Sequence, residues 1–293
     1  MISILVILMS GDDLPHSTIP TQTPFFRASE APRYLRQEEI QKYEEETSRS
    51  LVVFWGPIPA EVVAPFADAV NDISPDSPLD FMLTSLGGNA EAAIHMAAMC
   101  HTERADFRVI VPDTAASAAT LLALAAESVV MSNTSALGPV DPQIFMPQRK
   151  EYYPAKGILA IVDDLDNRTR RNPQAFELYA SLLADVDSIA YQTAKDALAR
   201  TEELIPEVLR LRTSPPNENQ VRAITKALQS SAMHSATIRY TQAKELGIPT
   251  EYLPPHSEIW NLLWRLHAHY AYLLGPRPRN NLIEGRRVSL RFG

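Results

Sequence analysis

The sequence predicts an α/β fold in which stacked β-α-β units form a largely parallel sheet, followed by a C-terminal helical region. Between residues 50 and 132, short continuous apolar runs alternate with helical patterns, which is typical of parallel strands buried on both faces. From about Pro173 onward, the apolar residues recur at helical spacing instead. Because 45% of the 293 residues are hydrophobic, the chain can bury a substantial core, which argues against a disordered protein.

Each unit of the expected sheet pairs an apolar strand with a helix. The expected strands are residues 50–58, 79–85, 106–112 and 128–132, and the expected helices between them are residues 59–73, 89–103 and 116–128. Further helices are expected within residues 173–212, 219–230 and 258–274. The first of these stretches has more apolar surface than one small sheet can cover. It therefore covers the sheet, mediates assembly, or does both.

Three regions follow from these patterns. Residues 1–49 form an N-terminal arm, which is polar and rich in proline and glutamate and is expected to be extended chain with a short solvated helix outside the core. Its apolar run Ile2–Met9 indicates a strand or a small interface anchor. Residues 50–170 form the α/β core, and residues 171–293 form a helical region that packs on it and mediates assembly.

Composition excludes several classes of protein. The single cysteine, Cys100, excludes an internal disulfide framework and favours a reducing compartment, and its place in a helical pattern predicts burial. The net charge of −8 argues against non-specific nucleic-acid binding. Residues 2–9 are too few to span a bilayer, which takes about 20, so we expect a cytoplasmic protein without membrane association. Neither a metal-ligand spacing nor a glycine-rich nucleotide loop is present, so no metal and no cofactor are expected.

Two strand-to-helix junctions carry the candidate chemistry. Gly87 and Gly88 follow the second strand, and Ser117 follows the third. Such junctions offer free N–H groups at the positive end of a helix dipole, and the carboxyl ends of parallel strands share one edge, so the two junctions can face each other. Alanines on both sides of Ser117 leave space over its hydroxyl, which suits a nucleophile. The alternatives are a tight turn that needs glycine and a serine that caps a helix, although Asp113 or Thr114 could also cap it and leave Ser117 inside the first turn.

The segments "TSLGGNAEAAIHMA", "VIVPDTAASAATLLALAAESVVMSNTSALGPVDPQ" and "SATIRYTQAKELGIP" resemble the serine dehydrogenase proteinase family. That family is related to signal peptide peptidase A and, more distantly, to the Clp protease and crotonase folds. The resemblance runs in order from about residue 50 to 255. It implies a Clp/crotonase-like fold, a homo-oligomer and the cleavage of peptides or proteins. It also implies that Ser117 is the nucleophile and that the N–H groups of Gly88 and Ala118 form the oxyanion hole, supported by the turn at Gly87.

The resemblance leaves the general base open. The chain has Leu86 where relatives have proline, which makes the backbone of the turn less fixed. It has Ala119 where relatives have glycine, and the added methyl group narrows the space beside Ser117. None of the seven histidines lies between Ser117 and Asp141, so a Clp-type Ser-His-Asp arrangement is not expected, and Asp141 is interpreted as a shaping residue.

Signal peptide peptidases use a lysine instead, and Lys150 and Lys156 are the candidates. We favour Lys156 because it opens a helix among apolar residues, where burial would lower its pKa, and the alternative is a surface lysine. His234 would orient a substrate or simply be satisfied at a helix end.

Two further functions remain open. The departures at Leu86 and Ala119 and the uncertain base favour a catalytically inactive Clp-fold scaffold or binding protein. A crotonase-type acyl-CoA hydratase or isomerase would share the paired-amide site but needs a glutamate in the cleft. Glu91 and Glu127 are the glutamates nearby, and both patterns place them on helix surfaces.

Overall fold

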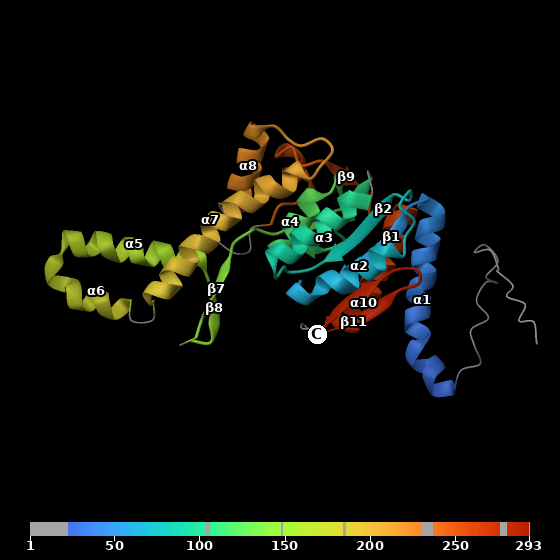
Figure 1. The fold of residues 1–293 in the computed structure, drawn as a ribbon, viewed down its shortest axis with the longest axis horizontal. Coiled ribbons are helices and arrows are strands. Elements are labelled where there is room, and N and C mark those ends of the chain that lie inside the picture. Colours follow the sequence, from blue (N-terminus) through green and yellow to red (C-terminus); the bar gives the residue numbers. More distant parts are fainter. Residues whose placement is uncertain are drawn as a thin grey trace, which may run out of the picture.

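A seven-stranded sheet in the order β11-β10-β1-β2-β3-β5-β9 forms the centre of the computed structural model (Figure 1). The structure describes residues 23–103, 106–147, 149–183, 186–229, 237–275 and 280–292. The predicted α/β fold with a largely parallel sheet is confirmed, because the four expected strands pair in parallel with one another. They are β1 (Ser50–Trp55), β2 (Leu79–Thr84), β3 (Phe107–Ile110) and β5 (Ser128–Met131).

The region 171–293 is not purely helical, which corrects the expectation from the sequence. It supplies β9 (Thr250–Tyr252), parallel to β5, and the antiparallel strands β10 (Asn281–Glu284) and β11 (Ser289–Phe292) at the other edge. β3 and β5 are equally short, but β9 and β10 carry Glu251 and Glu284, so no long apolar run marks these two strands in the sequence.

Helices cover both faces of the sheet, and the strands β1, β2, β3, β5 and β10 contribute side chains to both layers. On one face lie α2 (Val63–Asn71), α3 (Ala90–Glu103) and α4 (Ala118–Ala125), and on the other lie α1 (Pro24–Thr47) and α10 (Glu258–Leu274). Successive residues of β2 alternate between the two cores, since Phe81 packs in the first and Met82 in the second. The remaining elements are η1 (Ala60–Val62), β4 (Thr114–Ala115), β6 (Ala136–Leu137), α8 (Glu218–Gln229) and α9 (Tyr240–Glu245).

The N-terminal arm contains a core element, contrary to the prediction. Residues 24–47 form one 24-residue helix, α1, in which Arg36, Ile40 and Tyr43 are buried. The reason lies in partners far along the chain. Arg36 forms two hydrogen bonds with the buried carboxylate of Glu284, at 2.7 and 2.9 Å, and the Tyr43 hydroxyl donates to Asp80. The polar composition of this segment therefore predicted a solvent-exposed helix, although the helix packs on the core. The apolar run Ile2–Met9 lies outside the described residues.

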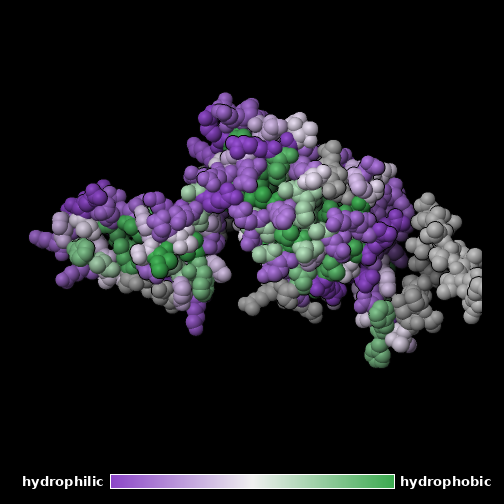
Figure 2. Space-filling model, in the orientation of Figure 1, coloured by the Kyte–Doolittle hydropathy of each residue, from purple (hydrophilic) through white to green (hydrophobic). Residues whose placement is uncertain are grey.

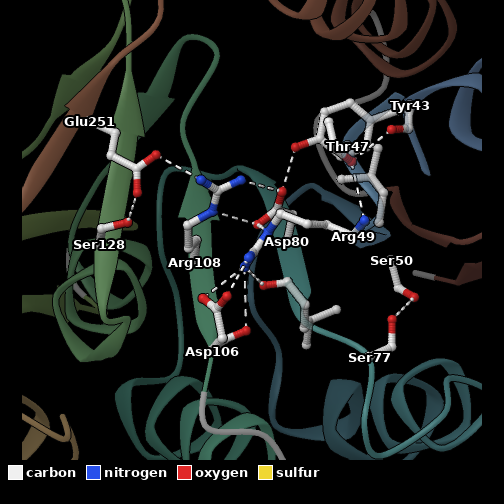
Figure 3. A network of polar contacts seen from close by, with 12 residues as sticks. Tyr43, Thr47, Arg49, Ser50, Ser77, Asp80, Asp106, Arg108, Ser128 and Glu251 are labelled. Carbon is white, nitrogen blue, oxygen red and sulfur yellow. Dashed lines mark hydrogen bonds and ion pairs between the residues drawn. The ribbon is translucent and has the colours of Figure 1, made fainter. Parts of the chain in front are cut away.

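Figure 3 shows how α1 is tied to the amino-terminal edge of the sheet. Asp80 is fully buried at the start of β2 and accepts hydrogen bonds from Arg49 Nε at 2.7 Å and from Arg108 at 2.7 and 2.9 Å. Arg108 continues to Glu251 on β9 at 2.7 Å, and Arg49 continues to Asp106. The carboxylate of Asp80 on β2 thus joins β3, α1 and the residue before β1 at the end of the sheet opposite the candidate site.

A long extension leaves the core on one side (Figure 1). It comprises the hairpin of β7 (Gln143–Met146) and β8 (Glu151–Pro154), followed by α5 (Ala155–Arg171), η2 (Pro173–Ala175), α6 (Phe176–Leu182) and the first part of α7 (Ser188–Arg210). It has a small apolar core of its own around Ile158 and Ala194. Figure 2 shows further apolar surface along it. The large exposed apolar side chains are Phe145, Tyr152, Ile161, Phe176, Leu178, Leu182 and Ile189.

Within the part of the chain that the structure describes, no helix combines the length and apolar character that crossing a bilayer requires. Cys100 is fully buried in α3, as its helical pattern predicts.

Candidate functional site

Ser117 stands on a sharp turn between β4 and α4. Its backbone has φ 55° and ψ −121°, a combination that side-chain-bearing residues rarely adopt and that costs about 1–3 kcal/mol. Two hydrogen bonds hold it there, one from its own N–H to Pro139 O at 3.0 Å and one from Leu121 N to its carbonyl at 3.2 Å. Ser117 occupies the N-cap position rather than the first turn, yet its side chain makes no capping hydrogen bond. The hydroxyl is therefore free to face a substrate.

The diglycine turn contacts Ser117 directly. Gly87 has φ 101°, and a Cβ at this position would lie 2.6 Å from Ser117 Cβ and 2.7 Å from Ala116 O. Gly88 has φ 145°, and a Cβ there would lie 2.3 Å from Ile58 O. Only glycine fits either position without displacement. The two junctions that the sequence placed at one edge of the sheet thus meet.

Hydrogen bonds clamp this turn in place. Ile58 N donates to Gly87 O at 2.9 Å, and Asn89 N donates to Ile58 O at 2.7 Å. Gly87 N donates to Ser85 Oγ at 3.0 Å. Ser85 was not predicted from the sequence, although a serine two residues before a glycine is a recognised side-chain turn pattern. The turn is therefore rigid at the point where it approaches the serine.

The amides of Gly88 and Ala118 differ from their neighbours. The N–H groups of Asn89, Ser117 and Ala119 all donate to backbone carbonyls, whereas those of Gly88 and Ala118 have no backbone acceptor among the described residues. Ala118 is also the first residue of α4, where N–H groups are unpaired and the helix dipole is positive. Two free donors next to a free hydroxyl can stabilise negative charge on an oxygen bound between them.

A groove of about 810 Å³ opens over these groups. Its walls come from the diglycine turn, α4, the segment after β6, the hairpin and α7. The lining residues are Leu86, Gly88, Asn89, Ala90, Ala116, Ser117, Ala118, Leu121, Pro139, Val140, Asp141, Pro142, Gln143, Tyr152, Thr201 and Leu204. Neither a histidine nor a lysine is among these described residues. Small and apolar walls with a few polar groups suit a segment of polypeptide.

The segment after β6 supports the serine from behind. Gly138 N donates to Ala115 O at 2.8 Å, and the buried Thr120 hydroxyl is 2.9 Å from both Ala115 O and Gly138 O. This role of Thr120 was not predicted, since a threonine in an alanine-rich helix carries no distinguishing pattern in the sequence. Asp141 lines the groove at the end of this segment.

Lys156 is not brought to Ser117 within one chain. It lies in the first turn of α5, and its Nζ donates to Gln229 O at the end of α8. It lines a different cavity, of about 460 Å³, between α5, α7 and α8. Lys150 is exposed in the hairpin turn between β7 and β8. His234 lies outside the described residues.

The glutamates that a crotonase-type reaction would need are also elsewhere. Glu91 pairs with Arg200 on the surface, with 2.9 Å between the charged groups. Glu127 accepts a hydrogen bond from Thr213 N at 2.6 Å. Neither lines the groove over Ser117. Among the described residues, no group of three or more His, Cys, Asp or Glu side chains is placed to hold a metal ion.

Comparison with family models identifies one family over most of the chain. The model of the family described as ClpP-like SDH-type serine proteinase matches residues 64–273. Uncharacterized protein MJ0137 and Uncharacterized protein MJ1495, both from Methanocaldococcus jannaschii, are each 29% identical to the chain, over 196 and 204 residues. These matches cover 67% and 69% of this chain but only 60% of the length of each relative.

Solved structures similar to the chain are more distant in sequence. ClpP1 from Listeria monocytogenes is 17% identical with a TM-score of 0.43, over 75% of this chain and 96% of that one. A mutant of the membrane-bound stomatin-specific protease 1510-N is 13% identical with a TM-score of 0.44, over 74% of this chain and 81% of that one.

Proposed function

Because the chain belongs to the ClpP-like SDH-type serine proteinase family, we propose that it is a serine peptidase that cleaves peptide bonds with Ser117 as the nucleophile. One observation carries the proposal. Among the described residues, the hydroxyl of Ser117 has no hydrogen-bond partner, and it borders the same groove as the amides of Gly88 and Ala118, which have no backbone acceptor there. A hydroxyl beside two fixed N–H donors is the arrangement that acyl transfer requires.

The proposed reaction has two halves. Ser117 Oγ attacks the carbonyl carbon of the scissile bond while its proton passes to a base, and the carbonyl oxygen becomes an oxyanion held by Gly88 N–H and Ala118 N–H. The C–N bond then breaks as the base returns that proton to the departing amine, which leaves an ester on Ser117. Water, deprotonated by the same base, hydrolyses the ester. Removal of one oxyanion donor typically costs 10²–10³ in rate.

We propose that the base is Lys156 of a neighbouring copy in a homo-oligomer. No lysine or histidine among the described residues lines the groove of a single chain, whereas the groove is bordered by Tyr152 of the extension, and the extension carries exposed apolar side chains suited to assembly. Lys156 lies in this extension, in the first turn of α5. Its ammonium must lose a proton to act as a base, which requires a desolvated position in the assembly.

Labelling with a fluorophosphonate probe tests both parts. Wild-type protein should be labelled, and Ser117→Ala should not be. Lys156→Ala should lose labelling, whereas Lys150→Ala, which neutralises the other candidate, should keep it. Mixing Ser117→Ala with Lys156→Ala subunits should restore labelling of the second, because each then supplies what the other lacks. Full labelling of Lys156→Ala alone would refute the role of Lys156 as the base. Absent labelling of the wild type would refute the proposal that the protein is a serine peptidase.

The second candidate is a catalytically inactive scaffold that keeps the fold for binding. It is favoured by the position of Lys156 on a separate cavity and by the methyl group of Ala119 beside the serine. It predicts that peptide ligands bind wild type and Ser117→Ala equally and that neither is labelled. A cytoplasmic location also belongs to the proposal, and it rests on the single buried cysteine.

A further inference from the structure

A second pocket lies beside the groove over Ser117, on the other side of Leu86. It has a volume of about 420 Å³ and sits at the carboxyl ends of β1, β2 and β3, where parallel sheets bind ligands. Leu86 lines both cavities, and its side chain is 80% exposed, so it stands between them. The lining residues are Trp55, Gly56, Pro57, Thr84, Ser85, Leu86, Asp113, Thr114, Leu274, Gly275 and Asn280.

One wall of this second pocket is a fixed aromatic surface. The ring of Trp55 packs on His267, with centroids 5.1 Å apart, and His267 stacks on Trp264 at 4.9 Å. Burial lowers the pKa of His267, so the imidazole is neutral at pH 7 and places no positive charge behind the wall. With Leu274 and Leu86, Trp55 offers apolar surface to the methylene stem of a long side chain. The face of an indole ring also attracts cations.

Asp113 is the one charged residue among the described residues that line the pocket. Asp113 is exposed in the lining, and no lysine, arginine or histidine lines the pocket within the described residues. Near the lining, Thr84 Oγ1 and Asn281 Oδ1 are buried without a hydrogen-bond partner in the described part of the chain, and both can accept a hydrogen bond. Asn281 Oδ1 lies directly beneath Gly56, 2.4 Å from where a Cβ of that residue would be. The pocket therefore favours a cation that carries an apolar stem.

We propose that this pocket binds a lysine or arginine side chain of the peptide substrate, close to the scissile bond, and that Asp113 is the residue that determines this specificity. The inference rests on the proposed peptidase activity of Ser117, because a polypeptide that crosses Leu86 would occupy both cavities at once. The volume accommodates an arginine with some water, at the lower end of the range of about 300–1,000 Å³ usual for ligand pockets. The net charge of −8 further favours basic substrates.

Peptides that differ at one position test the pocket. Each position on either side of the cleavage site is varied among lysine, arginine, norleucine and glutamate, and kcat/KM is measured. At one position, lysine or arginine should exceed norleucine by about tenfold at low salt, and the preference should fall as salt screens the charge pair. Asp113→Asn should abolish the preference, so that the lysine, arginine and norleucine peptides are cleaved with similar kcat/KM. Asp76→Asn removes the same charge from an exposed turn before β2 and should change nothing.

Binding to Ser117→Ala separates this inference from the proposed function. Fluorescence anisotropy of a labelled lysine peptide and its norleucine counterpart needs no turnover. A preference for the lysine peptide that disappears in the double variant with Asp113→Asn supports the pocket even if the wild type hydrolyses nothing. Equal or absent binding of both peptides overturns the pocket, as does a preference that survives Asp113→Asn. Hydrolysis without any preference for basic residues also overturns the proposed pocket, but it supports the proposed peptidase activity.

Discussion

Replacing Gly87 with alanine probes the geometry on which the proposed function depends. The added Cβ would lie 2.6 Å from Ser117 Cβ, 2.7 Å from Ala116 O and 3.0 Å from Ala118 N. Two of these three atoms are backbone, so no side chain can swing aside to relieve the contacts. Either the diglycine turn or the segment that carries Ser117 must move.

The size of the effect follows from the same geometry. An alanine held at φ 101° carries about 1–3 kcal/mol of backbone strain, so the free energy of unfolding should fall by that amount. The shift also separates the hydroxyl of Ser117 from the amides of Gly88 and Ala118. Misplacement of reacting groups by about 1 Å can cost about 10² in rate. We therefore expect fluorophosphonate labelling of Gly87→Ala to be about a hundredfold slower.

Gly157→Ala is the matched control. Gly157 lies in α5, and an added Cβ there would meet only Pro154 Cβ, at 3.9 Å. It should raise the free energy of unfolding by about 0.5–1 kcal/mol, as alanine does in a helix, and leave labelling unchanged. Labelling rates are compared at equal fractions of folded protein, checked by urea titration. A folded Gly87→Ala variant that is labelled at the wild-type rate would refute the contact between the turn and the nucleophile.

Three further changes test the frame around the site. Asp80→Asn leaves two guanidinium groups without their buried partner and should lower the free energy of unfolding by about 3–5 kcal/mol in urea titrations, whereas Asp164→Asn on the surface should cost about 0.5 kcal/mol or less. Thr120→Val removes the hydroxyl that bridges two carbonyls behind the serine and should cost about 1–3 kcal/mol and slow labelling. Burial lowers the pKa of His267, so protons bind the unfolded chain more readily. Stability is then full above the unfolded pKa of about 6.5 and is lost as the pH falls through the lower folded pKa, and His267→Phe should remove this component of the pH profile.

Local patterns were enough to predict the sheet and the meeting of its two junctions. The strands around Phe81 and Val109 are unbroken apolar runs, and a parallel sheet brings their carboxyl ends to one edge whatever the rest of the chain does. Gly87 and Ser117 follow these ends directly, so their proximity needed no long-range information. The catalytic roles of Ser117, Gly88 and Ala118 stay predictions.

Contacts between residues far apart in the sequence could not be predicted from local patterns. Arg36 and Glu284 are 248 residues apart, and nothing local marks either as buried, so α1 was interpreted as solvated. The neighbours of Lys156 predicted a partly buried lysine, but not that its ammonium would meet the carbonyl of Gln229 on α8, 73 residues later. The positive φ of Ser117 could not be predicted either, because glycine is the residue type that indicates such a conformation in a sequence.

The strain at Ser117 is itself an argument for chemistry over a scaffold. A serine with ordinary dihedrals at this N-cap position would accept a hydrogen bond from the first turn of α4 and contribute about 1 kcal/mol. Here the chain forgoes that bond and holds a rarely adopted backbone, at a combined cost of about 2–4 kcal/mol. In the part of the chain that the structure describes, the same distortion leaves the hydroxyl of Ser117 and the amide of Ala118 without hydrogen-bond partners, beside the amide of Gly88. A turn that only connected β4 to α4 would gain stability by relaxing, whereas a nucleophile with its oxyanion donors has to keep these three groups unpaired.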